Sequence, residues 1–447
     1  MVQIFIAFIL VVVLGGVAIV KPRSAIAATL VFLGVLGDFR RGVDVWSGYG
    51  GTDPILLVAP LVSFIIVAAA FAGNRLHLGD SLSRWVAALS ALMVLEIFNP
   101  AQGGPSVGFA GGLFYLVPMF WFWIGKAYGS TALVELVAFR VVVPLAVLAA
   151  ALEIYQVYFG LLPFEQAWVD AVPGYTALWI GANKVRPIAF FTSSSEMAQY
   201  IAVATTMVWA ASLRGRTILT LFIPLFVVGI FLASQRGVVV TTVFAATVQW
   251  AIQSGNRRSW LPRLSFALLF GFVVMSLALT QIQKSIVGGE AEELILHQTN
   301  GLLNPYDERE STVGLHASML ADGLADGFLH PFGRGLGATT IAAEKFGDQT
   351  ISTEVDLSNM MVSLGVFGGG LYLGIILMTI WKAVALWTMT RSLCALVIVG
   401  ALLNLGGNWL NGGEYSIVAL VWLFIGILDR LAQEVRNAPA ATRARYA

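Results

Sequence analysis

Apolar runs long enough to cross a bilayer recur along almost the whole chain, and they constrain its fold more than any other feature. A spanning helix needs roughly 20 apolar residues, and backbone groups in lipid must pair within their own segment. Runs of this length therefore predict helices. The expected spans are 2–20, 25–37, 54–73, 83–99, 108–128, 131–159, 194–212, 217–234, 237–253, 264–283, 358–388, 392–409 and 415–432.

These runs predict an all-α, polytopic membrane protein with about 12 to 14 transmembrane helices, because the second run is short and the eleventh is long. The composition agrees, with 58% hydrophobic and 11% charged residues, whereas soluble domains have about 45–50% apolar and about 25% charged residues. The first run lacks a basic segment and a cleavage motif. We therefore expect it to be a first span and not a signal peptide.

Charge, cysteine content and motifs exclude several function classes. The 26 Lys and Arg residues balance 25 Asp and Glu residues, so no overall basic field would recruit nucleic acid. The single cysteine, Cys394, excludes a disulfide framework and a cysteine-based metal site. The sequence has no HExxH, P-loop or GxGxxG motif. We therefore expect no metal, no cofactor and no nucleotide.

The basic residues predict an orientation. If the C-terminal tail is cytoplasmic and the spans alternate, 16 of the 26 Lys and Arg residues lie inside and 9 lie outside, with Arg140 within a span. An excess of Lys and Arg on the cytoplasmic side is the usual pattern. The N-terminus is then expected outside.

The spans divide the chain into three regions. These are an N-terminal transmembrane bundle at 1–283 with an outer loop at 160–193, a large outer loop at 284–357, and a C-terminal region at 358–447 of transmembrane helices and a basic tail. The large loop carries 12 acidic and 4 basic residues. Within it, Val313, Ala317, Leu320, Leu324 and Phe328 recur at helical spacing. They predict an amphipathic helix at 309–329 that covers the membrane domain.

Arginines on the outer side are candidate anion ligands, because topology disfavours them there. Arg236 lies between two apolar runs; it binds phosphate oxygens with its planar fork of donors, or it anchors a helix end by snorkelling. Arg186 precedes Pro187 and the serines at 193–195, one of which is expected to cap the next helix and leave its N-terminus as an anion site. The alternative for Arg186 is an ion pair with Glu165, Asp170 or Glu196.

The large loop contains further candidates. Arg309 either contributes to an anion site or pairs with its acidic neighbours, and His316 lies seven positions later on the same helical face. His316 is a candidate proton acceptor or a solvated surface histidine. Arg334, between two glycines, is expected in a turn. Glu354 and Asp356 precede the eleventh span. Either could deprotonate a hydroxyl; the alternative is that Asp356 or Ser358 caps the helix.

Four segments, in this order, resemble motifs of the O-antigen ligase and polysaccharide polymerase superfamily of bacterial membrane glycosyltransferases (Wzy/WaaL-like). They are RPIAFFTSSSEMA at 186–198, SQRG at 234–237, the surroundings of Arg309, and HPFGRGLG at 330–337. Ala189 stands where the family has glycine, and Glu196 where it has asparagine. The glycines at 365 and 368 match the family's early-helix GxxG. The resemblance covers about residues 180–385.

The resemblance implies a nucleotide- and metal-independent glycosyltransferase of the bacterial inner membrane. Its donor would be a glycan linked to undecaprenyl pyrophosphate, its acceptor a glycan or a lipid-linked acceptor, and its active site would face the periplasm. It assigns pyrophosphate binding to Arg186, Arg236 and Arg309. The catalytic base is then Glu354, Asp356 or His316. Attack opposite the leaving group would invert the anomeric centre.

One departure bears on the reaction. The ligases carry a histidine eleven residues before the GxxG, and here that position is Glu354. A polymerase of O-antigen or exopolysaccharide is therefore favoured, with an O-antigen ligase that transfers glycan to lipid A-core as the alternative. A lipid-linked glycan flippase is an alternative of another class. It would be expected to show paired halves and ionisable residues near the midplane, and a non-catalytic scaffold would need no converging arginines.

Overall fold

The computed structural model describes residues 2–48, 53–76, 79–171, 179–180, 184–254, 257–285, 288–289, 291–307, 311–340, 343 and 353–437. This part of the chain is almost entirely helical, with one antiparallel pair of two-residue strands. By length and composition, 7 of its helices could cross a membrane, or up to 8 if one bent pair counts as a single span. The described part of the chain is therefore that of a multi-pass membrane protein built almost entirely of helices.

Helices occupy every apolar run that the sequence predicts. The first half contains α1 (Val2–Val20), α2 (Pro22–Gly34), α3 (Leu36–Ser47), α4 (Val58–Ala72), α5 (Ser81–Glu96), α6 (Pro105–Tyr115), α7 (Val117–Tyr128), α8 (Thr131–Leu136), α9 (Val143–Phe159) and α10 (Pro163–Ala171). The second half contains β1 (Trp179–Ile180), β2 (Lys184–Val185), α11 (Ser194–Leu213), α12 (Ile223–Leu232), α13 (Arg236–Ile252), α14 (Trp260–Ser285), α15 (Glu292–Leu303), α16 (Val313–Leu329), α18 (Asp356–Thr390), α19 (Leu393–Asn404) and α20 (Tyr415–Asn437). Several of these are shorter than a full span, so the count of about 12 to 14 spans stays a prediction.

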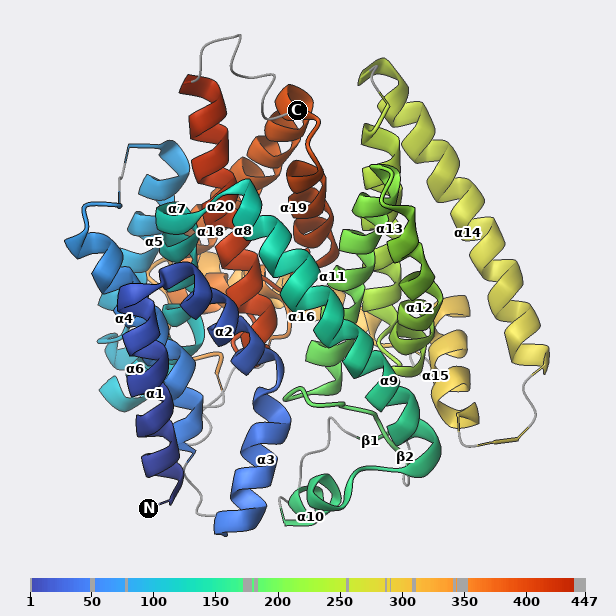
Figure 1. Cartoon of the computed structure of the whole chain (residues 1–447), viewed down its shortest axis with the longest axis horizontal. Coiled ribbons are helices and arrows are strands. Elements are labelled where there is room, and N and C mark those ends of the chain that lie inside the picture. The colour runs from blue at the N-terminus through green and yellow to red at the C-terminus, as the bar shows by residue number, and fades with distance from the viewer. Residues whose placement is uncertain are drawn as a thin grey trace.

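Burial differs sharply between the spans. In the most apolar stretch of α20, 83% of the residues are buried, against 6% in α14. Helices α20 and α7 pack closely against each other. A Cβ added at Gly426 would lie 2.0 Å from the carbonyl oxygen of Phe122, and a Cβ added at Gly125 would lie 2.2 Å from the carbonyl oxygen of Leu423. Small residues let two backbones approach this closely. Helix α14 instead stands at the edge of the molecule (Figure 1).

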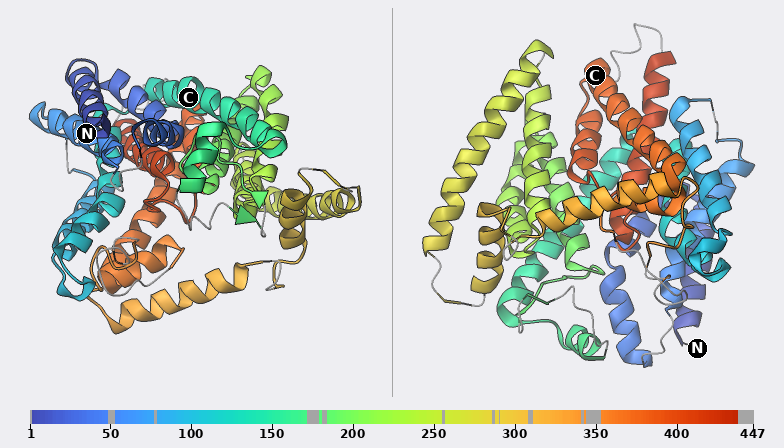
Figure 2. Two further views of the ribbon diagram at one scale, coloured as in Figure 1. Left: turned by 90° about the horizontal axis from the view of Figure 1, so that it is seen from below. Right: turned by 180° about the vertical axis from the view of Figure 1, so that it is seen from behind.

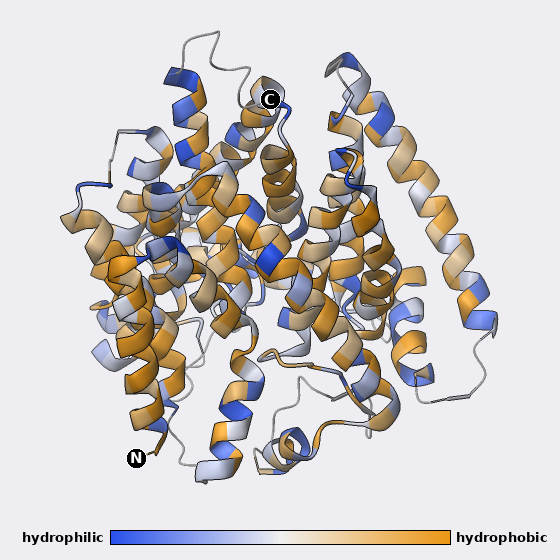
Figure 3. Cartoon of the chain, in the orientation of Figure 1, coloured by the Kyte–Doolittle hydropathy of each residue, from blue (hydrophilic) through white to orange (hydrophobic). Residues whose placement is uncertain are grey.

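The molecule has two distinct ends. Helices α3 and α10 and the strands β1 and β2 lie at the lower end in Figure 1, which we call the loop face. The C-terminal ends of α1, α4, α7 and α20 come together around one pocket, and we call that side the tail face. Figure 3 shows hydrophobic residues along most of α1, α9 and α14, with hydrophilic residues at the two ends of α14.

A break between α2 and α3 brings the chain to the loop face. The two helices differ in direction by 64°. At the start of α3, a Cβ on Gly37 would lie 2.0 Å from the Phe191 carbonyl oxygen. The backbone of α3 therefore packs directly on the segment that precedes α11.

The described part of the large loop includes the helices α15 and α16. Helix α16 overlaps the amphipathic helix predicted at 309–329, and Figure 2 shows it crossing the helical bundle. Its packing face overlaps the predicted one only in part. Gly323 and Gly327 are buried against Ser358 and Met361 of α18. Leu320 and Leu324 of the predicted face are half-buried beside these glycines, whereas Val313 and Ala317 are exposed. Phe328 of the predicted apolar face is 69% exposed.

Candidate functional site

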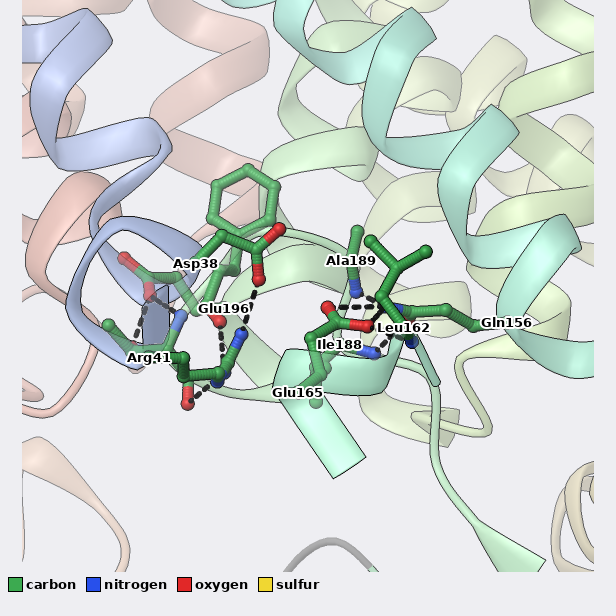
Figure 4. Close-up of polar contacts among 10 residues, drawn as sticks. Asp38, Arg41, Gln156, Leu162, Glu165, Ile188, Ala189 and Glu196 are labelled. Atoms are coloured by element: carbon green, nitrogen blue, oxygen red, sulfur yellow. Dashed lines mark hydrogen bonds and ion pairs between the residues drawn. The ribbon is translucent and has the colours of Figure 1, made fainter. Parts of the chain in front are cut away.

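Arg186 lies in the segment 184–193 between β2 and α11, and the side chain of Gln156 on α9 holds this segment. The Gln156 amide oxygen accepts hydrogen bonds from the backbone N–H groups of Ile188 (2.9 Å) and Ala189 (2.8 Å). Its amide nitrogen donates to the carboxylate of Glu165 at 2.8 and 3.0 Å. These contacts are drawn in Figure 4. A buried glutamine thus fixes the backbone directly after Arg186.

Two more side chains fix the other end of this segment. Arg41 of α3 donates to the Phe191 carbonyl oxygen at 2.6 Å and to Asp38 at 3.0 Å. Glu196 of α11 accepts from the backbone N–H of Thr192 at 3.1 Å (Figure 4) and from that of Ser416 at 2.7 Å. The segment is therefore tied to α3, α9, α11 and the start of α20.

The predicted serine cap of α11 is confirmed. The Ser193 hydroxyl accepts a hydrogen bond from the Glu196 N–H at 3.0 Å. The three carboxylates considered as partners of Arg186 make other contacts. Glu165 accepts from Gln156 and from the Leu162 N–H, Glu196 accepts from Thr192 and Ser416, and Asp170 accepts from Gln166. Burial, its largest influence, raises the pKa of Glu165 to about 7.

Arg236 is the first residue of α13 and lies against α15. A Cβ on Gly301 would come within 2.1 Å of the guanidinium carbon of Arg236. The Arg236 Nη2 group donates to the imidazole Nε2 of His297 at 2.8 Å. Ser234, two residues earlier, has φ 56°, a left-handed conformation that costs about 1–2 kcal/mol outside glycine. The turn into α13 is therefore strained where it presents the arginine.

Arg186, Arg236 and His297 form one electrostatic cluster, which we call the loop-face cation site. Burial lowers the pKa of Arg186, and the positive charge of Arg236 lowers it further. Burial first, then Arg236 and Arg186, lower the pKa of His297 to about 4. At neutral pH the site therefore holds two guanidinium groups and a neutral imidazole. It can offer several N–H donors to one anion.

The structure also brings together two of the three candidate bases. The Nδ1 atom of His316 on α16 lies 3.3 Å from a carboxylate oxygen of Glu354, and both side chains are partly exposed. Asp356 is instead 2% exposed. Its carboxylate accepts from the Tyr372 hydroxyl at 2.9 Å and the Leu410 N–H at 2.8 Å, which ties the start of α18 to the segment before α20.

The large loop carries two further candidate arginines, Arg309 and Arg334. Arg309 lies outside the described residues. Arg334 lies in a turn, as predicted, between Gly333 (φ 77°) and Gly335 (φ 101°). Its guanidinium binds Asp326 at 2.5 and 2.9 Å, and this contact, as the largest influence, lowers the pKa of Asp326.

Sequence reasoning missed two residues that complete the cation site, His297 and Gly301. His297 is 61 positions from Arg236, and no local motif connects them. Gly301 follows His297 by one helical turn, so both face the same neighbour. That i, i+4 spacing is the one local signal, and it has meaning only after α15 is placed beside α13.

Among the described residues, no group of three or more His, Cys, Asp or Glu side chains could hold a metal ion. Comparisons of the chain with models of known protein families and with curated proteins give no match.

Proposed function

We propose that the chain is a membrane glycosyltransferase that polymerises a surface polysaccharide from a glycan linked to undecaprenyl pyrophosphate. One observation carries the proposal: Arg236 donates to His297 at 2.8 Å, and the charges of Arg236 and of Arg186, which comes from a separate segment, both lower the pKa of that histidine. Guanidinium groups gathered in this way fit the two phosphates of a pyrophosphate. Arg309 is the third expected ligand from the large loop.

The segment around Ala189 supports the resemblance to the O-antigen ligase and polymerase superfamily. Ala189 has φ 42°, a conformation that favours glycine, and the motif it resembles has glycine at this place. The alanine is held there by the Gln156 contact. A backbone that needs a left-handed residue three positions after Arg186 is what the family pattern would produce.

The reaction follows from the donors at the site. A hydroxyl oxygen of the acceptor sugar bonds to the anomeric carbon of the donor while the bond from that carbon to the pyrophosphate oxygen breaks. The electron pair leaves with the pyrophosphate, and Arg186 and Arg236 stabilise its growing negative charge. Attack opposite the leaving group inverts the anomeric centre.

Glu354 and His316 are the proposed base. Together they can accept the proton of the attacking hydroxyl, because their side chains are in contact and partly exposed. Asp356 already accepts two hydrogen bonds in a buried position, so we assign it the positioning of α18. No nucleotide or metal enters this scheme.

The proposal includes a location. The loop face would be the outer face of a bacterial inner membrane, and the tail face the cytoplasmic one, because Lys and Arg are more numerous on the tail side when the spans alternate. The lipid part of the donor would lie among the helices. The acceptor would be a growing glycan or another lipid-linked acceptor.

The test is glycan transfer by the purified protein in proteoliposomes that contain an undecaprenyl-pyrophosphate glycan, without nucleotide or metal. Arg236→Ala should lower the rate by about 10²–10³, the usual effect of removing one transition-state donor. Lys284→Ala, which removes an exposed charge at the end of α14, should leave the rate unchanged. Products that lengthen indicate a polymerase, and transfer to lipid A-core indicates a ligase. Movement of the intact lipid between leaflets without transfer would overturn the proposal in favour of a transporter.

A further inference from the structure

A pocket of about 840 Å³ opens on the tail face, at the side of the molecule where the C-terminal ends of four helices meet. Cationic side chains dominate its lining: Lys21, Arg23, Arg75, Lys126 and Arg430. Among the described residues that line the pocket, Glu434 is the one carboxylate. The pocket therefore has a strong positive charge in a concave wall.

Two of these cations already have partners within the wall. Lys126 pairs with the buried Asp429 and donates to Gln433 at 3.3 Å. Arg430 pairs with Glu434 at 2.8 Å and donates to the Ala127 carbonyl oxygen. The lining carboxylate is thus used within the wall, and it does not neutralise the other cations.

The charge that faces a ligand comes from Lys21, Arg23 and Arg75. Within the described part of the chain, none of the three forms an ion pair with a carboxylate. Arg75 is held with its guanidinium 5.2 Å from the ring centre of Tyr128. Helix α2 begins at the pocket with Pro22, and no side chain caps it. Its N-terminus adds a partial positive charge to the same place.

The pocket lies beside apolar surface. Ile19 and Val20, directly before Lys21, are 70% and 76% exposed, and Phe71, four residues before Arg75, is 74% exposed. They belong to α1 and α4, two of the spans. Exposed apolar side chains on such helices face lipid tails. The boundary between lipid tails and charged groups therefore passes along the edge of the pocket.

We propose that the tail-face pocket binds the phosphate group of an anionic phospholipid, with the acyl chains lying along α1 and α4. The guanidinium and ammonium groups match phosphate oxygens, and basic pockets between transmembrane helices are known to hold acidic lipid head groups. A lipid, and not a soluble phosphate, is the expected occupant because the apolar ends of α1 and α4 border the pocket. This site is separate from the loop-face cation site and does not depend on the proposed reaction.

The test counts bound lipid on the detergent-purified full chain by native mass spectrometry, with phosphatidylglycerol, phosphatidylcholine and inorganic phosphate as probes. Wild type should retain phosphatidylglycerol saturably and bind phosphatidylcholine at least tenfold more weakly. The double variant Lys21→Ala/Arg75→Ala should lose at least tenfold in affinity for phosphatidylglycerol. The charge-conserving double variant Lys21→Arg/Arg75→Lys should retain most of it, which shows that the effect is one of charge.

The control is Arg84→Ala/Arg214→Ala, which removes two exposed charges of the chain that do not line the pocket. It should bind phosphatidylglycerol as wild type does. Equal loss in the control and pocket variants, or equal binding of the two lipids, would overturn the proposal. The proposal would also be overturned if the pocket bound inorganic phosphate in place of the lipid and this binding depended on Lys21 and Arg75. The site would then take a soluble anion.

Discussion

At the scale of single residues, Gly301 determines where the guanidinium of Arg236 can lie. Gly301 of α15 leaves room for the Arg236 side chain, which would meet a Cβ there at 2.1 Å. The nearby His297 accepts a hydrogen bond from the same guanidinium. The position of the Arg236 guanidinium therefore depends both on the absence of a side chain at Gly301 and on the imidazole of His297.

We predict that Gly301→Ala displaces the Arg236 guanidinium and lowers the transfer rate by about 10²-fold, close to the effect of removing the donor. The fold should survive, because the group that must move is the flexible end of a side chain. Gly314→Ala on α16 is the matched control, since nothing lies within 4 Å of a Cβ there. Initial rates and thermal unfolding of both variants check this. A Gly301→Ala protein with an unchanged rate would contradict it.

A second residue-scale prediction concerns His297, whose pKa is lowered to about 4. Because the unfolded chain protonates its histidine near pH 6.5, the free energy of unfolding should fall as the pH drops from 6.5 towards 4. An anion between the arginines should raise the pKa of His297, so binding inorganic pyrophosphate at pH 5 should take up protons. Calorimetry in buffers of different ionisation enthalpy measures this uptake.

The variant His297→Gln isolates the histidine from the protonation of pyrophosphate itself. Proton uptake by wild type should exceed that of the variant, and affinity in wild type should rise more steeply as the pH falls. Identical uptake by the two proteins would place the anion away from His297.

At the scale of elements, the segment 184–193 depends on side chains from other helices. Gln156, Arg41 and Glu196 hold its backbone, and Ala189 is held at φ 42°. Such a conformation costs an alanine about 1–2 kcal/mol. The surrounding hydrogen bonds offset that cost, which is how a strained segment can remain in place beside Arg186.

We predict that Ala189→Gly stabilises the protein by about 0.5–1 kcal/mol, because glycine adopts this φ without strain although it loses more chain entropy on folding. Ala198→Gly in the second turn of α11 should have the opposite sign and cost roughly 1 kcal/mol. Denaturation midpoints of the two variants, measured side by side in the same detergent, test the pair. Destabilisation by both would show that the backbone at 189 is not strained.

The elements were largely predictable, and the site was predictable in part. Apolar runs identify helices because their signal is local and repeats over many residues, and helices occupy all of them. The sequence predicts helix α16 but not its packing through Gly323 and Gly327. An apolar pattern is recognised by its large side chains, and glycines do not contribute to it. Arg186 and Arg236 were singled out by their surroundings in the sequence. His297 was not, since only the tertiary placement of α15 joins it to them.

At the scale of the whole molecule, each of the two faces carries its own group of cationic side chains. The loop face gathers Arg186, Arg236 and His297, and the tail face carries a basic pocket. The distribution of Lys and Arg along the sequence predicts that the tail face is cytoplasmic. The two anion sites would then lie on opposite sides of one membrane.

That orientation can be measured with single cysteines in a Cys394→Ser background. Gln166→Cys, exposed on α10 at the loop face, should react in intact cells with a maleimide that cannot cross the inner membrane. Arg214→Cys, exposed after α11, should react only after the membrane is permeabilised. The reverse pattern would place the loop-face cation site in the cytoplasm and exclude the proposed donor geometry.

The difference in burial between α20 and α14 also determines how readily each helix can accept amino-acid substitutions during evolution. In α20, 83% of the apolar stretch is buried, and Gly426 has no room for even a methyl group. In α14, 6% is buried, and most side chains are exposed, so in a bilayer they would meet lipid. On α14, one apolar residue can replace another at little cost, because lipid tails are fluid and do not require a side chain of a particular shape. Related chains should therefore diverge fastest along α14 while keeping its hydropathy, and keep α20 almost letter for letter.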